Sequence, residues 1–190
     1  MTAGGRRAGA LALGLLLLLG AGAAAEPGSP GAFPGAWRRA GRILREGRTD
    51  LYLSGYAYHG RGTYSRAKLD DLNERAWGIG AGRSLARGPR WGEGLYVIAS
   101  RDSHGEIQAA AGYVRTWRWT SCPWVTPGLG FTPFLWSRAD VLGRLPFPAV
   151  LPVGTLELGR AALVISYLPP VHGRADFADV LGVLVRLSLR

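Results

Sequence analysis

The chain has 190 residues and a formal net charge of +10, and nearly all of its basic residues are arginines. This length corresponds to one domain, or to one domain plus a processed segment. The arginine excess favours an anionic partner, either nucleic acid or the headgroups of a lipid surface. The single cysteine, Cys122, excludes an intramolecular disulfide and a metal site built from cysteines.

Residues 1–25 have the three parts of a secretory signal peptide. Arg6 and Arg7 form a basic start, Ala8–Gly20 an apolar run, and Ala23–Ala25 a cleavage site of small residues. The apolar run is shorter than the ~20 residues that a transmembrane helix needs. We therefore predict that this segment is removed and that the mature chain is exported to the periplasm, the outer membrane or the medium.

Residues 26–49 are predicted to form a linker and an amphipathic helix. Glu26–Ala36 is rich in Pro and Gly, and Trp37–Glu46 has an apolar and a basic side. The apolar side holds Trp37, Ile43 and Leu44, and the basic side holds Arg38, Arg39, Arg42 and Arg45. A helix of this kind fits a membrane surface, and it equally fits a solvated helix packed on a domain.

After residue 49 the pattern changes to β-strands, and residues 50–190 are predicted to be one β domain. Eight strand-like segments follow one another: Leu51–Arg61, Glu74–Leu85, Gly94–Arg101, Ile107–Trp119, Val125–Trp136, Ala149–Gly159, Ala161–Tyr167 and Phe177–Leu189. Glycine is frequent inside them, which helps a sheet to curve. An even number of short strands, aromatic residues near the strand ends and an export signal fit a small outer-membrane β-barrel. A soluble eight-stranded barrel of the lipocalin type fits the same strand pattern.

A short polar turn, Asp102–Glu106, joins the third predicted strand to the fourth. Asp and Ser side chains hydrogen-bond their own backbone, so turn formation alone accounts for Asp102 and Ser103. In an up-and-down barrel with an even number of strands, the odd-numbered strands end at the same rim. His59, near the end of the first strand, therefore shares this rim with Asp102 and Ser103. Two strand spacings separate them, roughly 10 Å, so a hydrogen-bonded Ser-His-Asp relay is not implied.

Several motifs, in order along the chain, resemble those of one family. They are Asp50-Leu51-Tyr52, Tyr58-His59-Gly60-Arg61, Leu72-Asn73-Glu74-Arg75-Ala76-Trp77-Gly78, Gly94-Leu95-Tyr96, Asp102-Ser103, Ala111-Gly112-Tyr113, Gly128-Leu129-Gly130-Phe131-Thr132, Leu145–Pro152 and Tyr167-Leu168-Pro169. Each motif is short, but their order and spacing, from Trp37 to the end of the chain, are specific. On these residues the chain resembles the lipid A palmitoyltransferases (PagP family) of Gram-negative outer membranes.

The resemblance implies an all-β fold, an eight-stranded antiparallel transmembrane β-barrel preceded by a short N-terminal amphipathic helix on the periplasmic side. It implies an outer-membrane acyltransferase that moves a palmitoyl or somewhat shorter chain from the sn-1 position of a glycerophospholipid to a hydroxyacyl chain of lipid A. The partners are then a phospholipid donor, the lipid A of lipopolysaccharide as acceptor, and membrane lipid, without nucleic acid, metal or cofactor. The chain is expected to be a monomer whose active site faces the outer leaflet. The alternative is a non-catalytic barrel that binds lipid or serves as a structural or adhesive surface protein.

Three residues match the catalytic positions of the family, namely His59, Asp102 and Ser103. The resemblance implies that His59 is the general base on the accepting hydroxyl, since the reference pKa of imidazole, about 6.5, allows the neutral form at a membrane surface. Asp102 then orients His59 or stabilises its charged form. Ser103 is either a nucleophile or an oxyanion donor, and the sequence leaves both roles open.

The sequence departs from the family pattern at several positions. Ser54 and Ala76 stand where family prolines interrupt one pair of strands, which puts an opening at that point in doubt. Pro152 and Pro169 match a second pair of prolines, which cannot donate to the ladder, so a lateral lipid gate is expected between strands six and seven. The chain also ends in Leu189-Arg190, where an aromatic residue is common.

A further departure is Val114, which stands where relatives have a small residue deep in the barrel. Val114 is in register with Gly112, and we expect both to line the acyl-chain pocket. The branched valine side chain would shorten this pocket, so we predict a preference for chains shorter than palmitate by about two methylenes or more. A shift of strand four by one residue would turn Val114 toward lipid and abolish this effect.

Overall fold

The computed structural model describes residues 32–60, 74–75, 77–102, 105–119, 124–139, 141–169 and 180–189. The predicted signal peptide, residues 1–25, lies outside the described residues. Ala76, Ser103 and Cys122 lie outside them as well, so their predicted roles stay predictions.

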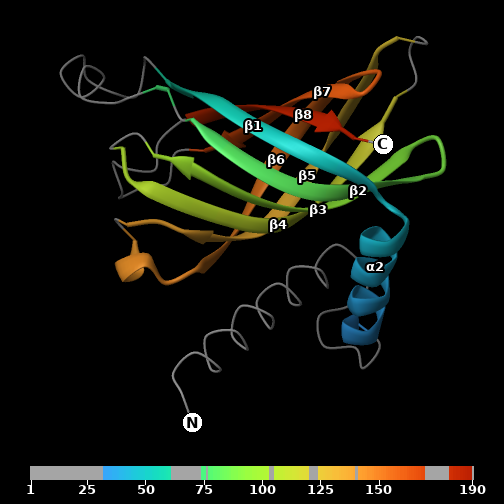
Figure 1. Ribbon diagram of the computed structural model, residues 1–190, viewed down its shortest axis with the longest axis horizontal. Coiled ribbons are helices and arrows are strands. Elements are labelled where there is room, and N and C mark those ends of the chain that lie inside the picture. Colours follow the sequence, from blue (N-terminus) through green and yellow to red (C-terminus); the bar gives the residue numbers. More distant parts are fainter. Residues whose placement is uncertain are drawn as a thin grey trace.

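In the described part of the chain, one helix is followed by eight strands that pair in chain order, each antiparallel to the next, and β1 also pairs with β8 to close a barrel (Figure 1). The elements are α2 (Ala32–Glu46), β1 (Arg48–His59), β2 (Gly78–Arg87), β3 (Trp91–Arg101), β4 (Ile107–Arg118), β5 (Thr126–Ser137), the 3-10 turn η1 (Leu142–Arg144), β6 (Phe147–Leu158), β7 (Ala161–Leu168) and β8 (Val180–Ser188). This confirms the predicted fold class. The short η1 was not predicted.

The barrel has two ends that differ in what lies at them. At the helix end, α2 leads into β1 at Arg48 and β8 finishes at Ser188; at the rim end, β1 finishes at His59 and β3 at Arg101. Figure 1 shows α2 and the C-terminus together at the right and the rim end at the left. Both termini of the barrel therefore lie at the end opposite His59, as an even number of antiparallel strands requires.

The outer wall of the barrel is apolar. Large apolar side chains on five strands point outward and are 41–61% exposed: Leu53, Ile79, Val97, Leu129 and Val150. Their neighbours along each strand point into the lumen, because side chains alternate with a period of two. An apolar outer belt around a partly polar lumen is the arrangement of a transmembrane barrel, and it excludes the soluble lipocalin-type alternative.

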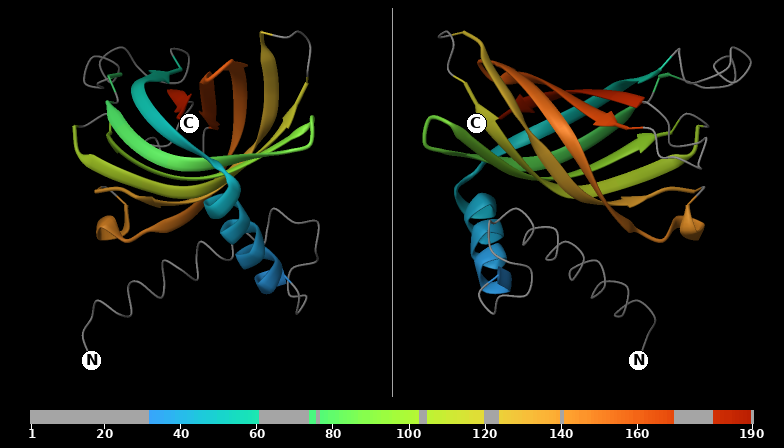
Figure 2. Two further views of the ribbon diagram at one scale, coloured as in Figure 1. Left: turned by 45° about the vertical axis from the view of Figure 1, so that its right-hand side comes forward. Right: turned by 180° about the vertical axis from the view of Figure 1, so that it is seen from behind.

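The helix α2 packs against the outside of this wall at the helix end (Figure 2). Ala36, Ala40 and Ile43, spaced along one helix face, bury themselves with Tyr113 of β4. Trp37 and Leu44 were predicted on the same apolar side as Ile43, but they are 56% and 55% exposed. The prediction did not say which side of the helix meets the barrel: Ala36 and Ala40 form the contact face together with Ile43, whereas Trp37 and Leu44 lie away from the wall.

An ion pair between Arg39 and Glu93 also joins the helix to the same wall. Glu93 of β3 is 3% exposed and lies 3.2 Å from Arg87 and 3.9 Å from Arg39 of α2. A carboxylate buried to this degree requires positive partners to offset the loss of hydration.

The described helices include none that is long and apolar enough to cross a membrane.

Glycines on β2 allow the wall to curve. A Cβ atom added to Gly80 would lie 2.5 Å from the carbonyl oxygen of Val97 on β3. Any larger residue would therefore force β2 and β3 apart at this point, which explains why a glycine occurs in the middle of a paired strand.

Candidate active site

The barrel encloses one large cavity of ≈ 530 Å³, which inward-facing residues of all eight strands line. This volume lies within the range of about 300–1,000 Å³ that is usual for small-molecule sites. His59 and Asp102, two of the three predicted catalytic residues, line its rim end.

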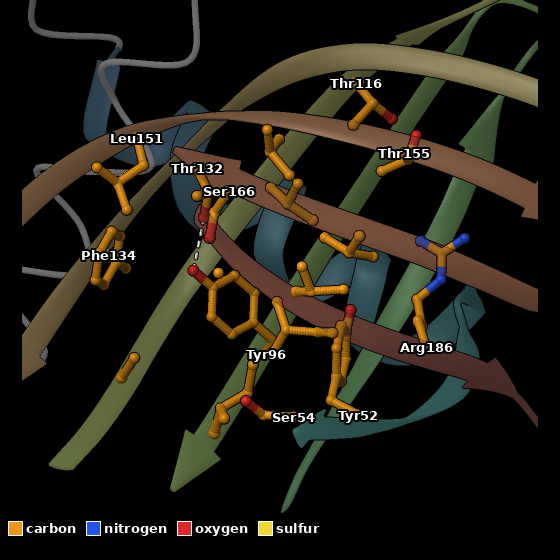
Figure 3. A pocket seen from close by; sticks show the side chains of 18 of the residues that line it. Tyr52, Ser54, Tyr96, Thr116, Thr132, Phe134, Leu151, Thr155, Ser166 and Arg186 are labelled. Atoms are coloured by element: carbon orange, nitrogen blue, oxygen red, sulfur yellow. Dashed lines mark hydrogen bonds between the residues drawn. The ribbon is translucent and has the colours of Figure 1, made fainter. Parts of the chain in front are cut away.

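The lining of the cavity changes along the barrel axis. Charged and polar side chains line both ends of the cavity, and apolar side chains line much of its wall from the middle toward the rim: Ile98, Ala110, Phe134, Leu151, Val164, Leu168, Val180 and Leu184. Figure 3 shows this separation, with Arg186, Thr116 and Thr155 on one side and Phe134 with Leu151 on the other. The rim half thus offers a site for a hydrocarbon chain, and the helix end does not.

Charges at the helix end neutralise one another inside the lumen. Glu157 accepts hydrogen bonds from Arg118 at 3.3 Å and from Arg186 at 2.8 Å. The hydroxyl of Ser188 donates to Asp50, which is 1% exposed, at 2.6 Å. This network forms a polar floor below the apolar compartment.

Two tyrosines lie between the apolar compartment and the polar floor. The single hydroxyl proton of Thr132 goes to the carbonyl oxygen of Tyr113 at 3.0 Å, so Tyr96 donates its own proton to Thr132 at 2.6 Å (Figure 3). The ring of Tyr52 lies 5.9 Å from that of Tyr96. The Tyr96 ring reaches across Gly112, where an added Cβ would approach its hydroxyl to 2.8 Å. Gly112 therefore makes room for Tyr96.

Val114 faces the lumen and lines the cavity. It pairs with Gly94 on β3, and an added Cβ at Gly94 would come within 3.1 Å of it. On its own strand Val114 is the last apolar inward residue before Thr116 and Arg118. Val114 thus stands at the boundary between the apolar compartment and the polar floor.

A β-bulge turns His59 into the lumen. The inward residues of β1 are at first the even-numbered ones, among them Tyr52 and Ser54, but the pairing with β8 shifts between Ser54 and Tyr56. After this shift the odd-numbered Ala57 and His59 line the cavity and His59 is 3% exposed, whereas Tyr56, which also touches the cavity, is 42% exposed. A regular strand would have pointed His59 toward lipid, because a one-residue shift exchanges the two faces.

Asp102 follows β3 and is 5% exposed. Its Oδ1 accepts a hydrogen bond from the backbone N–H of Glu106 at 2.9 Å, and its own N–H donates to the Glu106 carbonyl at 2.8 Å. The turn chemistry expected for this residue is therefore present. Asp102 also lines the cavity with His59, so the turn holds its carboxyl group at the rim end.

Other polar residues at the rim end were not predicted from the sequence. Trp136 donates from its indole nitrogen to Gln108 at 3.1 Å, and Gln108 donates to Ser100 at 3.1 Å. The guanidinium of Arg138 lies 5.0 Å from the centre of the Trp136 ring. Ser100, Gln108 and Trp136 lie on three neighbouring strands, and Arg138 follows the third of them. Every second residue of a strand faces inward, but the sequence alone does not show whether the even-numbered or the odd-numbered residues do so.

Two ladders stop short of the rim. The β6–β7 ladder ends at Val153 with Ser166, although β6 begins at Phe147 and β7 continues to Leu168. Of the predicted lateral gate, Pro152 is the residue next to this last pair on β6, and Pro169 directly follows the end of β7. The β1–β2 ladder ends at Ser54 with Gly78.

Among the described residues, no group of three or more His, Cys, Asp or Glu side chains is arranged to hold a metal ion.

Comparison with known proteins identifies the family. The family model of the antimicrobial peptide resistance and lipid A acylation protein PagP matches residues 39–186. The chain belongs to the PagP family. The lipid A acyltransferase PagP of Bordetella bronchiseptica is 38% identical over 167 residues, which cover 88% of this chain and 92% of that relative. The lipid A acyltransferase PagP of Legionella pneumophila is 39% identical over 144 residues, which cover 76% and 75% of the two chains.

Among solved structures, the outer membrane protein Ail of Yersinia pestis aligns with 76% of this chain and 100% of its own. The TM-score is 0.42 and the sequence identity is 10%, a distant likeness that carries no conclusion about function. Membership in the PagP family confirms the predicted resemblance and the prediction that the chain is an acyltransferase. The alternative of a non-catalytic barrel is thereby set aside.

Proposed function

We propose that the protein transfers a palmitoyl or somewhat shorter acyl chain from the sn-1 position of a glycerophospholipid to a hydroxyacyl chain of lipid A. The reaction takes place in the outer membrane, where the protein acts as a monomer with its rim end at the outer leaflet. The observation that carries this proposal is the location of His59 and Asp102, both buried, at the rim end of a cavity that has many apolar side chains next to them. An acyl chain placed among those side chains brings its ester to these two residues.

In the proposed reaction, His59 removes the proton of the acceptor hydroxyl, and the hydroxyl oxygen attacks the carbonyl carbon of the sn-1 ester. The bond from this carbon to the glycerol oxygen breaks, and the imidazolium returns the proton to that oxygen. The products are acylated lipid A and a lysophospholipid. Asp102 supports the positive charge on His59. Ser103 is proposed as an oxyanion donor or as the nucleophile of an acyl-enzyme, and acyl trapping on Ser103 distinguishes these two roles.

The donor is proposed to reach the cavity through the lateral gate at Pro152 and Pro169. The shortened β6–β7 ladder supports this route, since backbone hydrogen bonds would otherwise have to break to admit a lipid. Replacing both prolines with alanine should slow donor turnover without changing the fold. An unchanged dependence of the rate on phospholipid concentration would argue against the gate.

Mass spectrometry of lipid A tests the function as a whole. Cells that express the protein should contain lipid A with one additional acyl chain, and cells that lack it or express His59→Ala should not. Purified protein with a phospholipid labelled only at the sn-1 chain should transfer the label to lipid A. Transfer of an sn-2 label instead would contradict the proposed donor position.

A further inference from the structure

The rim part of β1 is held by a residue outside the regular sheet. After the β1–β2 ladder ends at Ser54, the backbone N–H of Ala57 donates to the carbonyl oxygen of Glu74 at 2.9 Å. Glu74 precedes β2, in a segment predicted from the sequence to be part of that strand. It is instead detached from the ladder, and β2 begins at Gly78. Glu74 therefore replaces a strand neighbour next to the bulged part of β1.

The side chain of Glu74 is directed to His59. Its Oε2 accepts the hydroxyl hydrogen of Tyr56 at 2.9 Å, while Oε1 lies 3.4 Å from the backbone nitrogen of His59 and 3.9 Å from its Nδ1. The His59 side chain is 4% exposed and that of Glu74 is 20% exposed. A carboxylate at this distance, largely sheltered from water, interacts appreciably with an imidazolium.

We propose that Glu74 is a positioning residue for His59. It keeps the Nδ1 side of the ring toward its own carboxylate, which leaves Nε2 to take the proton of the acceptor hydroxyl, and it stabilises the imidazolium until that proton is returned to the leaving glycerol oxygen. This inference rests on the proposed role of His59 as the general base. It assigns Glu74 no contact with substrate.

A structural role for Glu74 makes a different prediction. If Glu74 only supports the end of β1, an uncharged acceptor of the same shape should serve as well. Glutamine is such an acceptor, because its side-chain oxygen can still bond the backbone N–H of His59. Glu74→Gln thus removes the charge while the shape is retained, whereas Glu74→Ala removes both.

The experiment measures kcat, KM and the pH–rate profile of the full-length protein in bilayers, with a short-chain phosphatidylcholine donor and lipid A. Glu74→Gln should lower kcat about 10- to 100-fold with little change in KM. The acid limb of its profile should move to lower pH by roughly 0.5–1 pH unit, because an imidazole without the neighbouring carboxylate loses its proton more readily. The remaining titratable or charged groups that the described elements bring to this end of the cavity are Asp102, Arg138 and Tyr56, which all variants retain.

The matched control is Glu106→Gln. Glu106 is another acid at the rim, and its side chain pairs with Arg144 at 2.8 Å, whereas it contacts Asp102 through its backbone, which the substitution retains. It should keep the wild-type kcat and pH profile. Barrel folding is verified for each variant by heat-modified migration on gels.

Three results would overturn the inference. The first is a wild-type kcat and pH profile in Glu74→Gln. The second is a lowered kcat in Glu74→Ala together with a wild-type kcat in Glu74→Gln, which would mean that only the shape of the side chain matters. The third is an equally lowered kcat in Glu106→Gln. His59→Ala, assayed beside them, separates this inference from the proposed function. An inactive His59→Ala with a fully active Glu74→Gln would reject the role of Glu74 alone, whereas an active His59→Ala would reject the catalytic assignment itself.

Discussion

The two halves of the lumen use polar residues in opposite ways. At the helix end, Glu157 lies between Arg118 and Arg186, so that buried charges neutralise one another. At the rim end, His59 and Asp102 are more deeply buried than these three residues, and they line the cavity next to its apolar part. Buried charges at the helix end are part of the fold, and those at the rim end are placed for chemistry.

This difference predicts which property each half controls. Substitutions at the rim end should change the reaction and leave the barrel folded, because they leave the charge network at the helix end in place. Substitutions at the helix end should change stability and leave the reaction nearly intact. Measuring both properties for variants of each half tests the division.

The largest effect is expected for the rim residues. His59→Ala, Asp102→Ala and Ser103→Ala should each lower acyl transfer by about 10²–10⁴-fold, because each removes a group assigned to proton transfer or charge stabilisation. The barrels should remain folded, with thermal unfolding and heat-modified migration as controls. Wild-type transfer rates in all three folded variants would refute the catalytic assignment.

At the helix end, Glu157→Ala should lower the free energy of unfolding by about 2–4 kcal/mol. The substitution leaves Arg118 and Arg186 in the lumen without their shared carboxylate, and a broken buried pair costs up to about 5 kcal/mol, less where the side chains keep some contact with water, here 15–20%. Urea unfolding in detergent or bilayers gives the value. At urea concentrations below the unfolding transition, the acyl-transfer rate should change by a few-fold at most. A large loss of this rate in folded protein would show that the helix end also controls the reaction.

Deleting α2 should lower the free energy of unfolding by about 2–3 kcal/mol, the contribution of burying Ile43 and its neighbours on the barrel wall. Transfer activity should remain measurable, because the helix lies at the end opposite His59 (Figure 1). The single substitution Ile43→Ala provides a milder version of the same test. Complete inactivation of a folded deletion variant would mean that the helix also acts on the rim end.

The smallest effect concerns the boundary between the halves. Val114→Gly should lengthen the apolar compartment, so that longer acyl chains gain about 1–3 kcal/mol, or roughly 5- to 150-fold in preference. Competition between phospholipids of graded chain length, with wild type and variant side by side, measures the shift. If both proteins prefer the same chain length, Val114 does not limit the depth of the pocket.

The catalytic residues illustrate what sequence patterns leave open. The rim end was predicted for His59 from the parity of the strands, but its inward direction depends on the bulge after Ser54, which no alternation of apolar residues announces. Glu74 was predicted inside a strand and instead contacts His59 from outside the ladder. Ser103 lies outside the described residues, so its place in the site is still a prediction.

The sequence by itself determined the number of strands, their bounds to within four residues, the family, and the helix that precedes the strands except for its first turn: Ala32–Ala36, predicted as linker, is helical. These features follow from local patterns, namely alternation, glycine-rich breaks and motifs at regular spacing, which each segment carries independently of the rest. Only the tertiary structure decided which face of α2 meets the barrel, which alternate residues of β1 face the lumen, and where two ladders stop. Those outcomes depend on contacts between segments far apart in the chain, such as Ala57 with Glu74 and Tyr96 with Thr132, and such contacts exist only after the barrel has closed.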